Sequence, residues 1–244
     1  MNLAIDVGNT DIKLGVFDKN HLIDNFRTRS EGLYNLLKRI IDDYNSIEAV
    51  IFSSVGSLEK SCLTFLESED LLVMELSHEL NLPFTNLYKT PTTLGVDRIA
   101  LVAAAVYNFS GKNTLIIDAG TCITYDFKDV EENYLGGAIS PGIGLRYASL
   151  HSYTAKLPLL DKKSPNSLVG TSTDEAIHSG IINGIISEID GIIERYCNTY
   201  DDLTVILTGG DAHFLSKRLK NSIFATSNFL LEGLNYILGI NKDK

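Results

Sequence analysis

The stretch IDVGNTDIKLGVFD, residues 5–18, consists of two apolar, β-branched segments joined by a Gly-Asn corner. This pattern predicts a β-hairpin with strands over residues 2–8 and 13–18. Residues 117–126, IDAGTCITYD, repeat nearly the same phrase in the second half of the chain. The repetition predicts a duplicated fold, in which two domains of the same design face each other across a cleft.

The segments that follow each hairpin alternate between strand and helix patterns. In residues 31–44, for example, Leu33, Leu37 and Ile40 recur with the helical period. This order favours two mixed sheets flanked by helices, divided near the polar turn at 110–113 into domains 1–112 and 113–244. Strands are expected over 21–28, 48–55, 70–76, 113–120, 122–127, 132–142 and 204–208, and helices over 31–44, 60–67, 91–109, 142–156, 173–197 and 228–239.

Composition narrows the function classes. The 244 residues are 44% hydrophobic and 21% charged, with a net charge of −10 and no basic run. Sequence-independent nucleic-acid binding needs clustered Lys and Arg, so no nucleic-acid partner is expected. The three scattered cysteines have no CxxC spacing, which argues against a disulfide framework or a zinc site. With no signal-peptide or membrane-span pattern, we expect a cytoplasmic protein without a membrane partner.

The first hairpin turn has the chemistry of a phosphate site. Gly8 allows close backbone approach, and consecutive N–H groups at such a turn form an anion-binding nest to which Asn9 and Thr10 add donors. Lys13 would add a point charge, and Asp6 could hold Mg²⁺, usually through water. The alternative is an ordinary hairpin turn with an exposed aspartate.

The second hairpin and a later glycine pair extend this pattern. Asp118 occupies the place of Asp6, and Thr121 supplies a hydroxyl, so the two hairpins could grip a nucleotide polyphosphate from opposite sides. Gly209 and Gly210 follow a predicted strand, where bare backbone can lie against a ring or a ribose. Cys122 is better explained as a small packing residue than as a nucleophile, because the motif offers no His or Lys to activate it.

Five motifs in this order resemble those of type III pantothenate kinases. They are DVGNT (6–10), GVDR (95–98), DAGT (118–121), GGAISPG (136–142) and TGGD (208–211), and they span nearly the whole chain. The resemblance implies an α/β fold of two duplicated ribonuclease-H-like (actin-like) domains. Each would be a mixed five-stranded sheet flanked by helices, with the active site in the interdomain cleft. The final helix is a candidate to pack back on the first domain.

The resemblance also implies an activity. Family members use ATP to phosphorylate the primary hydroxyl of pantothenate, the first committed step towards coenzyme A. Asp97 matches the general base, a suitable role for a carboxylate that can accept the hydroxyl proton. The ATP-binding loop with its Mg²⁺ matches Asp6, Val7, Gly8, Asn9, Thr10, Asp11, Ile12 and Lys13.

The pantothenate site is also implied by the resemblance. Gly95, Val96 and Arg98 match its substrate-binding motif together with Asp97, and a guanidinium can bind the carboxylate of pantothenate in a forked geometry. For this pair the alternative is a helix-start acid with a surface arginine. Tyr88 and Thr173 match substrate contacts, for which a packed tyrosine and a helix N-cap threonine are the alternatives.

Asp118 matches a monovalent-cation ligand of the family, for K⁺ or NH₄⁺, and Thr121 an ATP contact. The family is dimeric, with substrate sites completed across the interface. The apolar helix at 177–193 agrees with such a homodimer, although packing in the chain's own core would explain it equally well.

Two departures and two alternative functions stay open. Gly56-Ser57 stand where the family often has an apolar pair, and Ser172 precedes Thr173 where the family has Asn. A non-catalytic, transcription-linked accessory protein on the same fold is one alternative. Another small-molecule kinase of the superfamily, or a related sugar kinase or phosphatase, is the other. The joint presence of Asp6, Lys13, Asp97, Arg98 and Asp118 argues against the non-catalytic protein.

Overall fold

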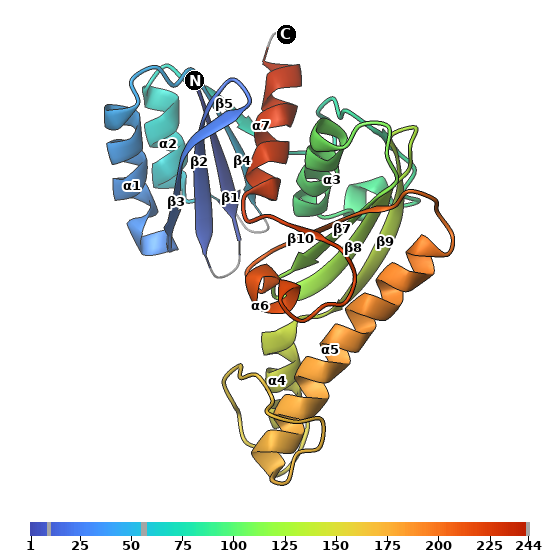
Figure 1. The fold of residues 1–244 in the computed structure, drawn as a ribbon. Helices are drawn as coiled ribbons and strands as arrows, with labels where there is room; N and C mark the ends of the chain where they lie inside the picture. Colours follow the sequence, from blue (N-terminus) through green and yellow to red (C-terminus); the bar gives the residue numbers. More distant parts are fainter. Residues whose placement is uncertain (9–10, 55–57, 243–244) are drawn as a thin grey trace. The chain divides into compact units, whose positions relative to one another are not determined.

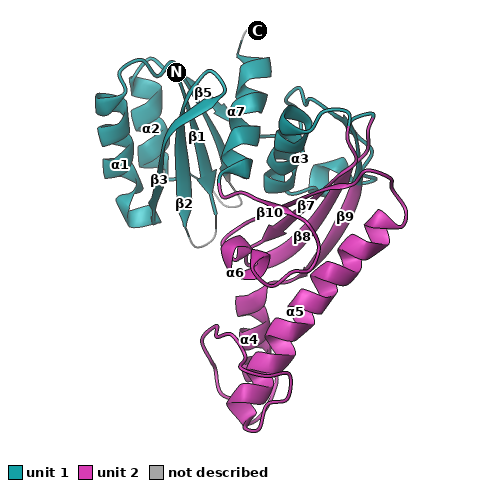
Figure 2. Cartoon of the chain, viewed as in Figure 1, with its two compact units in different colours: residues 1–111, 131–135, 228–244 teal, residues 112–130, 136–227 magenta. Residues whose placement is uncertain are grey.

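A computed structural model describes residues 1–8, 11–54 and 58–242 (Figure 1). The chain forms two compact units, each assembled from separate segments (Figure 2). The first unit consists of Met1–Gly111, Glu131–Leu135 and Asn228–Lys244, and the second of Lys112–Val130 and Gly136–Ser227. The C-terminal helix α7 (Phe229–Asn241) therefore belongs to the first unit.

The predicted hairpin is the centre of a five-stranded mixed sheet in the first unit. The order is β3-β2-β1-β4-β5, in which β1 pairs antiparallel with β2 and parallel with β4. The side chains of Asp6, Lys13 and Ser53 are thereby carried by three neighbouring strands. The strands are β1 (Asn2–Val7), β2 (Ile12–Asp18), β3 (His21–Thr28), β4 (Ala49–Ser54) and β5 (Leu72–Glu75).

Alternation along β1 decides which helices cover each face of this sheet. Leu3 and Ile5 point into a core that contains Leu37 of helix α1 (Ser30–Asp43) and Leu66 of helix α2 (Lys60–Ser68). The other face lies against α7, where Leu231 comes close to Gly15 of β2. Figure 1 shows α1 and α2 on one side of the sheet and α7 on the other. The prediction of a sheet flanked by helices is therefore confirmed for this unit.

Helix α7 packs most closely on helix α3 (Val96–Asn108), whose residues from Arg98 to Val106 are buried. Gly233 makes this approach possible, because a Cβ atom at that position would lie 1.8 Å from the carbonyl oxygen of Ala100. Gly239, on the same helix, has no atom within 4 Å of the corresponding position. Small residues on both helices thus allow close packing of α7 on α3, the helix that carries Asp97.

We expect Gly233→Ala to lower the free energy of unfolding by about 2–3 kcal/mol, because the added methyl group overpacks the α3–α7 contact. Gly239→Ala should instead raise it by about 0.5–1 kcal/mol, since Gly inside a helix is less stable than Ala. Urea unfolding of both variants measures the difference. Equal stability of the two variants would contradict the close packing.

The second sheet has six strands in the order β11-β10-β7-β8-β9-β6, rather than the five that the resemblance implies. Two of them, β6 (Thr85–Asn86) and β11 (Phe224–Ala225), have only two residues each, too few to give an alternating pattern. The other four match predicted strands: β7 (Thr114–Ala119), β8 (Cys122–Lys128), β9 (Asn133–Pro141) and β10 (Thr204–Thr208).

One long helix covers the core of the second unit. Helix α5 (Thr173–Cys197) buries Ile182, Ile185 and Ile189 against residues of β7 and β8, such as Leu115 and Tyr125. Packing in the chain's own core therefore accounts for these residues, and they no longer argue for a dimer. Helices α4 (Ile143–Ser152) and α6 (Ala212–Ser216) complete the unit.

The predicted helix at 91–109 begins later than expected. Pro91–Thr93 form a short 3-10 turn, η1, and α3 starts only at Val96, with Gly95 as its N-cap. Among all helices within residues 1–8, 11–54 and 58–242, none combines the length and the apolar composition that crossing a membrane requires.

Candidate active site

Asp6 lies at the end of the central strand of the first sheet, between two polar neighbours. Its cross-strand partners are Lys13 on β2 and Ser53 on β4. The hydroxyl of Ser53 donates a hydrogen bond to the Asp6 carboxylate at 3.2 Å. Ser53 was not among the predicted site residues, although a polar residue at the carboxyl end of the strand beside β1 is a usable signal.

The surroundings of Asp6 favour a bound cation. Burial raises the pKa of Asp6, and the negative charge of Asp97 raises it further, whereas Lys13 and the Ser53 hydroxyl lower it in part. The negative charge of the Asp6 carboxylate is therefore only partly offset by its neighbours, and a bound metal ion would offset it further. Carboxylate and hydroxyl oxygens are the donors that Mg²⁺ prefers, so these residues fit that ion.

Only a few protein ligands are available there. Within the described ranges, no group of three or more His, Cys, Asp or Glu side chains could hold a metal ion. Mg²⁺ commonly binds through one or two carboxylates and completes its shell with water and substrate phosphates. The donor set around Asp6 is therefore adequate for Mg²⁺ bound together with a nucleotide.

The rest of the predicted phosphate loop is only partly described. Val7 pairs with Ile12, and a Cβ atom on Gly8 would lie 3.0 Å from the carbonyl oxygen of Asp11. The Asp11 carboxylate forms an ion pair with Arg27 at 2.5 Å, and the hydrogen bond from Arg27 lowers the pKa of Asp11. Asp11 thus has a local structural partner. Asn9, Thr10 and the Gly56-Ser57 departure lie outside the described residues.

Asp97 lies in the first turn of α3. Its carboxylate accepts a hydrogen bond from the backbone N–H of Arg98 at 2.9 Å. Gly95 makes room for this arrangement, because a Cβ atom there would lie 2.3 Å from the same carboxylate oxygen. Negative charge is favoured at a helix N-terminus, so the start of α3 both holds and orients Asp97. Val96, half-buried, is the first residue of the helix.

Arg98 is buried beside the ring of Tyr88. Its guanidinium carbon lies 5.6 Å from the centre of the Tyr88 ring, and only 5% of the residue is exposed. The Tyr88 ring stacks on Tyr134 at a centroid distance of 6.1 Å. Tyr88 is therefore packed, and its neighbour Arg98 is also a predicted substrate-binding residue. Tyr134 was missed, because nothing in its local sequence distinguishes it from a core tyrosine.

In the second unit, Asp118 lies beside Gly209. Strands β7 and β10 are parallel neighbours, so Asp118 is level with Thr208 and the glycine follows directly. Gly209 has a φ of 94°, and a Cβ atom there would lie 2.3 Å from an oxygen of the Asp118 carboxylate. Only glycine fits both the backbone angle and the space. Gly210, in contrast, is exposed with open space around it.

The turn of the second hairpin is packed against the end of β9. The N–H group of Gly142 donates to the carbonyl oxygen of Thr121 at 3.0 Å. A Cβ atom on Gly142 would lie 2.1 Å from the carbonyl oxygen of Gly120. The GGAISPG motif therefore supports the turn that carries Thr121, which itself is exposed. Gly142 was not among the predicted site residues.

Carbonyl oxygens add to the oxygen donors beside Asp118. The carbonyl of Ala119 accepts from the N–H of Asp211 at 2.9 Å, and a carbonyl oxygen has a second lone pair. A carboxylate with neighbouring carbonyl groups suits a hard cation such as K⁺. These residues therefore fit a monovalent cation.

Thr173 is exposed at the first position of α5. The N-cap is Ser172, whose hydroxyl accepts a hydrogen bond from the N–H of Glu175 at 3.3 Å. The alternative explanation of Thr173 as the capping residue is therefore wrong. No described hydrogen bond joins its side chain to another predicted site residue.

Comparisons with known proteins give a consistent family. The sequence profile of the type III pantothenate kinase family matches residues 2–195. A type III pantothenate kinase from Christiangramia forsetii is 52% identical over 242 residues, covering 99% of each chain. One from Flavobacterium johnsoniae is 50% identical over 235 residues, covering 96% of each chain.

Solved structures add evidence on the fold alone. A conserved candidate Baf family transcriptional activator from Campylobacter jejuni superposes with a TM-score of 0.65 at 21% identity, covering 99% of this chain and 100% of the other. A ROK hexokinase from Thermus thermophilus gives a TM-score of 0.53 at 13% identity, covering 98% and 99%. Both support the actin-like kinase fold that the sequence motifs implied.

Proposed function

Because the chain belongs to the type III pantothenate kinase family, we propose that Asp97 is the general base of its reaction and that the two hairpins bind Mg·ATP. The chain is an enzyme that transfers a phosphoryl group from ATP to pantothenate in coenzyme A biosynthesis. One observation carries the assignment of the base. Asp97 is held in the first turn of α3 by a hydrogen bond from the Arg98 N–H group at 2.9 Å, and its negative charge raises the pKa of Asp6.

The proposed chemical step is an in-line transfer of the γ-phosphoryl group. Asp97 accepts the proton of the pantothenate hydroxyl as the oxygen–phosphorus bond forms and ADP leaves. The Arg98 N–H group keeps the carboxylate turned to one side. Asp6 would hold Mg²⁺, and Lys13 would add positive charge beside the phosphates. Mg²⁺, when bound, neutralises charge on the transferred group.

Arg98 and Tyr88 are proposed to bind pantothenate. Pantothenate carries a carboxylate, and a planar guanidinium offers two parallel N–H donors to it. Burial of Arg98 beside the Tyr88 ring restricts its rotamers before the substrate arrives, which lowers the entropy cost of binding. Gly95 and Val96 supply the backbone of the same segment.

Asp118 is proposed to bind a monovalent cation, and Thr121, Gly209 and Gly210 to contact ATP. Asp118 and Gly209 lie side by side at the ends of β7 and β10. A cation there would offset part of the negative charge of the polyphosphate.

Removing K⁺ and NH₄⁺ from the assay is expected to lower kcat/KM for ATP by about 10-fold or more, since the bound cation would offset part of the negative charge of the polyphosphate. The measurement is initial rate against K⁺ concentration at constant ionic strength with choline as the replacement cation. Full turnover in Na⁺ or choline alone would remove the monovalent site from the proposal.

We further propose a cytoplasmic homodimer that needs neither a membrane nor a nucleic acid. In this proposal Thr173 contacts pantothenate, and the substrate sites are completed across the dimer interface, as the family resemblance implies. The acidic net charge of −10 supports the expectation that nucleic acid is not a ligand.

ADP release with a panel of hydroxyl substrates tests the function. Pantothenate should be turned over with Mg·ATP, whereas glucose, N-acetylmannosamine and glycerol should not. If a folded preparation turned over a sugar and not pantothenate, the substrate assignment would be wrong. No turnover of any substrate would favour the accessory-protein alternative.

A further inference from the structure

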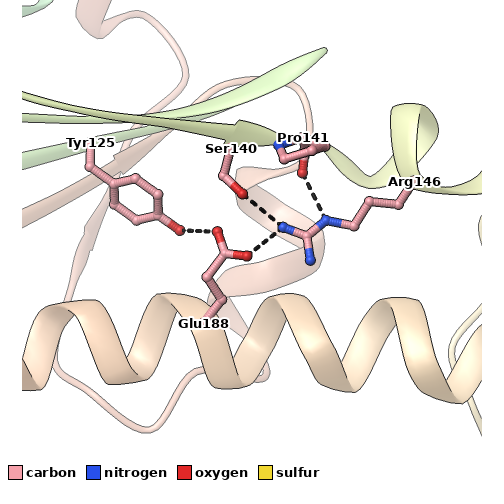
Figure 3. Close-up of polar contacts among 5 residues, drawn as sticks. All are labelled: Tyr125, Ser140, Pro141, Arg146 and Glu188. Carbon is pink, nitrogen blue, oxygen red and sulfur yellow. Dashed lines mark hydrogen bonds and ion pairs between the residues drawn. The ribbon is translucent and has the colours of Figure 1, made fainter. Parts of the chain in front are cut away.

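A polar network joins four elements of the second unit beneath the GGAISPG motif (Figure 3). The guanidinium of Arg146, in the first turn of α4, donates to the carbonyl oxygen of Pro141 at 2.8 Å, to the hydroxyl of Ser140 at 3.0 Å and to Glu188 at 2.5 Å. The second oxygen of Glu188, in the middle of α5, accepts from the hydroxyl of Tyr125 at 2.9 Å. We call these five residues the Arg146 network.

The network is charged and largely shielded from water. The side chains of Arg146 and Glu188 are 21% and 26% exposed, and Tyr125 on β8 is buried. Burial raises the pKa of Glu188, but hydrogen bonds from Arg146, Ser140 and Tyr125 outweigh it and leave that pKa lowered. A buried ion pair adds little stability over well-packed apolar residues. Because Arg146 donates to three acceptors around the end of β9, we interpret the network as holding this end of the strand in position.

Arg146 holds Ser140 and Pro141 at the end of β9, and the next residue contacts the second hairpin turn. Directly after Pro141, the N–H of Gly142 donates to the carbonyl oxygen of Thr121, and its α-carbon packs on Gly120. Tyr125 is part of β8, the returning strand of the same hairpin. The network thus contacts the hairpin in two ways, through Tyr125 in its own strand β8 and through the end of β9, which packs against its turn.

We propose that Arg146 and Glu188 are positioning residues that fix the second hairpin turn for binding of ATP and its monovalent cation. This inference rests on the proposed role of Asp118 and Thr121 in that binding. Neither Arg146 nor Glu188 needs to touch the substrate. Displacing a binding group by about 1 Å is enough to weaken a site strongly, and loss of such an outer partner typically costs about 10–100-fold in affinity or activity.

The test uses Arg146→Lys and Glu188→Gln in the full-length enzyme. Lysine keeps the charge but cannot donate to three acceptors in the fixed fork of a guanidinium. Glutamine keeps the size of glutamate but loses the charge and replaces one of the two accepting oxygens by an NH₂ donor. Both variants should raise the KM for ATP and the K⁺ concentration for half-activation by about 10-fold. The KM for pantothenate should change less than about twofold, because Arg98 and Tyr88 lie in the first unit and Thr173 lies about four turns from Glu188 along α5. Arg195→Lys and Glu194→Gln, exposed on α5, are matched controls expected to behave as wild type.

The results for Arg146→Lys, Glu188→Gln and Asp118→Asn together decide whether the positioning role and the proposed cation and ATP site hold. Unchanged ATP and K⁺ constants in both variants, or a fall in kcat and Tm alone, would overturn the positioning role. Where Arg146→Lys does not fold, Glu188→Gln, which keeps every side-chain size, decides. Asp118→Asn is measured alongside: if it also leaves the ATP and K⁺ constants unchanged, the proposed cation and ATP site fails and the inference falls with it. A change in Asp118→Asn alone would overturn only the inference.

Discussion

Replacing Asp97 with Asn is expected to lower kcat by about 10²–10⁴-fold, the usual effect of losing a general base. Asparagine has nearly the same shape and can still accept the hydrogen bond that the Arg98 N–H group donates at 2.9 Å. The start of α3 should therefore keep its geometry, while the ability to take up the hydroxyl proton is lost. Steady-state rates with saturating pantothenate and Mg·ATP measure the loss.

The control for this variant is Glu31→Gln. Glu31 is also an acid in the first turn of a helix, α1, so both substitutions remove a favourable charge from a helix N-terminus. Both should cost a few tenths of a kcal/mol of stability, but only Asp97→Asn should lose turnover. Calorimetric binding of ADP and pantothenate to Asp97→Asn should stay near wild type. Wild-type turnover in this variant would show that another group takes the proton.

The sheet framework could be predicted because it depends on local patterns. Both hairpins and the strand at 49–54 stand in the sequence as apolar, β-branched runs, and the long helix Thr173–Cys197 follows the helical period. The two-residue strands β6 and β11 could not, since they exist only through pairing with β9 and β10. The late start of α3 has a similar cause: Pro91 and Gly95 favour a turn and a cap, which the helical pattern alone conceals.

The candidate site was predictable where a motif combines glycine with a charged residue. Asp6, Asp97 and Asp118 each stand in such a motif, and the structure places Asp6 with Asp97 and Asp118 with Gly209. Supporting residues carry no such signal. Ser53 is near Asp6 only because β4 pairs with β1, and Glu188 reaches Arg146 from a different helix 42 positions later. Their roles depend on tertiary contacts that a sequence pattern cannot express.

Gly111→Ala is a control for Gly209→Ala, because it separates the effect of a positive φ from the effect of the neighbouring atoms. Gly111 also has a positive φ, 71°, but no atom lies within 4 Å of the position of a Cβ atom there. Gly111→Ala should therefore cost about 1 kcal/mol of stability from the left-handed backbone alone. Activity and the K⁺ response of this variant should stay near wild type, because Gly111 donates its described hydrogen bond to Glu132, which is not a predicted site residue.

Gly209→Ala is expected to lower kcat/KM for ATP by about 10²-fold and to weaken the K⁺ response, with the stability loss of Gly111→Ala as a minimum. The new methyl group would lie 2.3 Å from the Asp118 carboxylate and 2.5 Å from the carbonyl oxygen of Ala119, so one or both must move. These are the oxygen atoms proposed to hold the cation beside the ATP phosphates. Initial rates against ATP and K⁺, together with thermal unfolding, measure both effects. If Gly209→Ala lost only stability and kept its ATP and K⁺ constants, the nucleotide would have to bind away from Asp118. A loss confined to ATP and K⁺, with the KM for pantothenate unchanged, would instead support a role of Gly209 in nucleotide and cation binding.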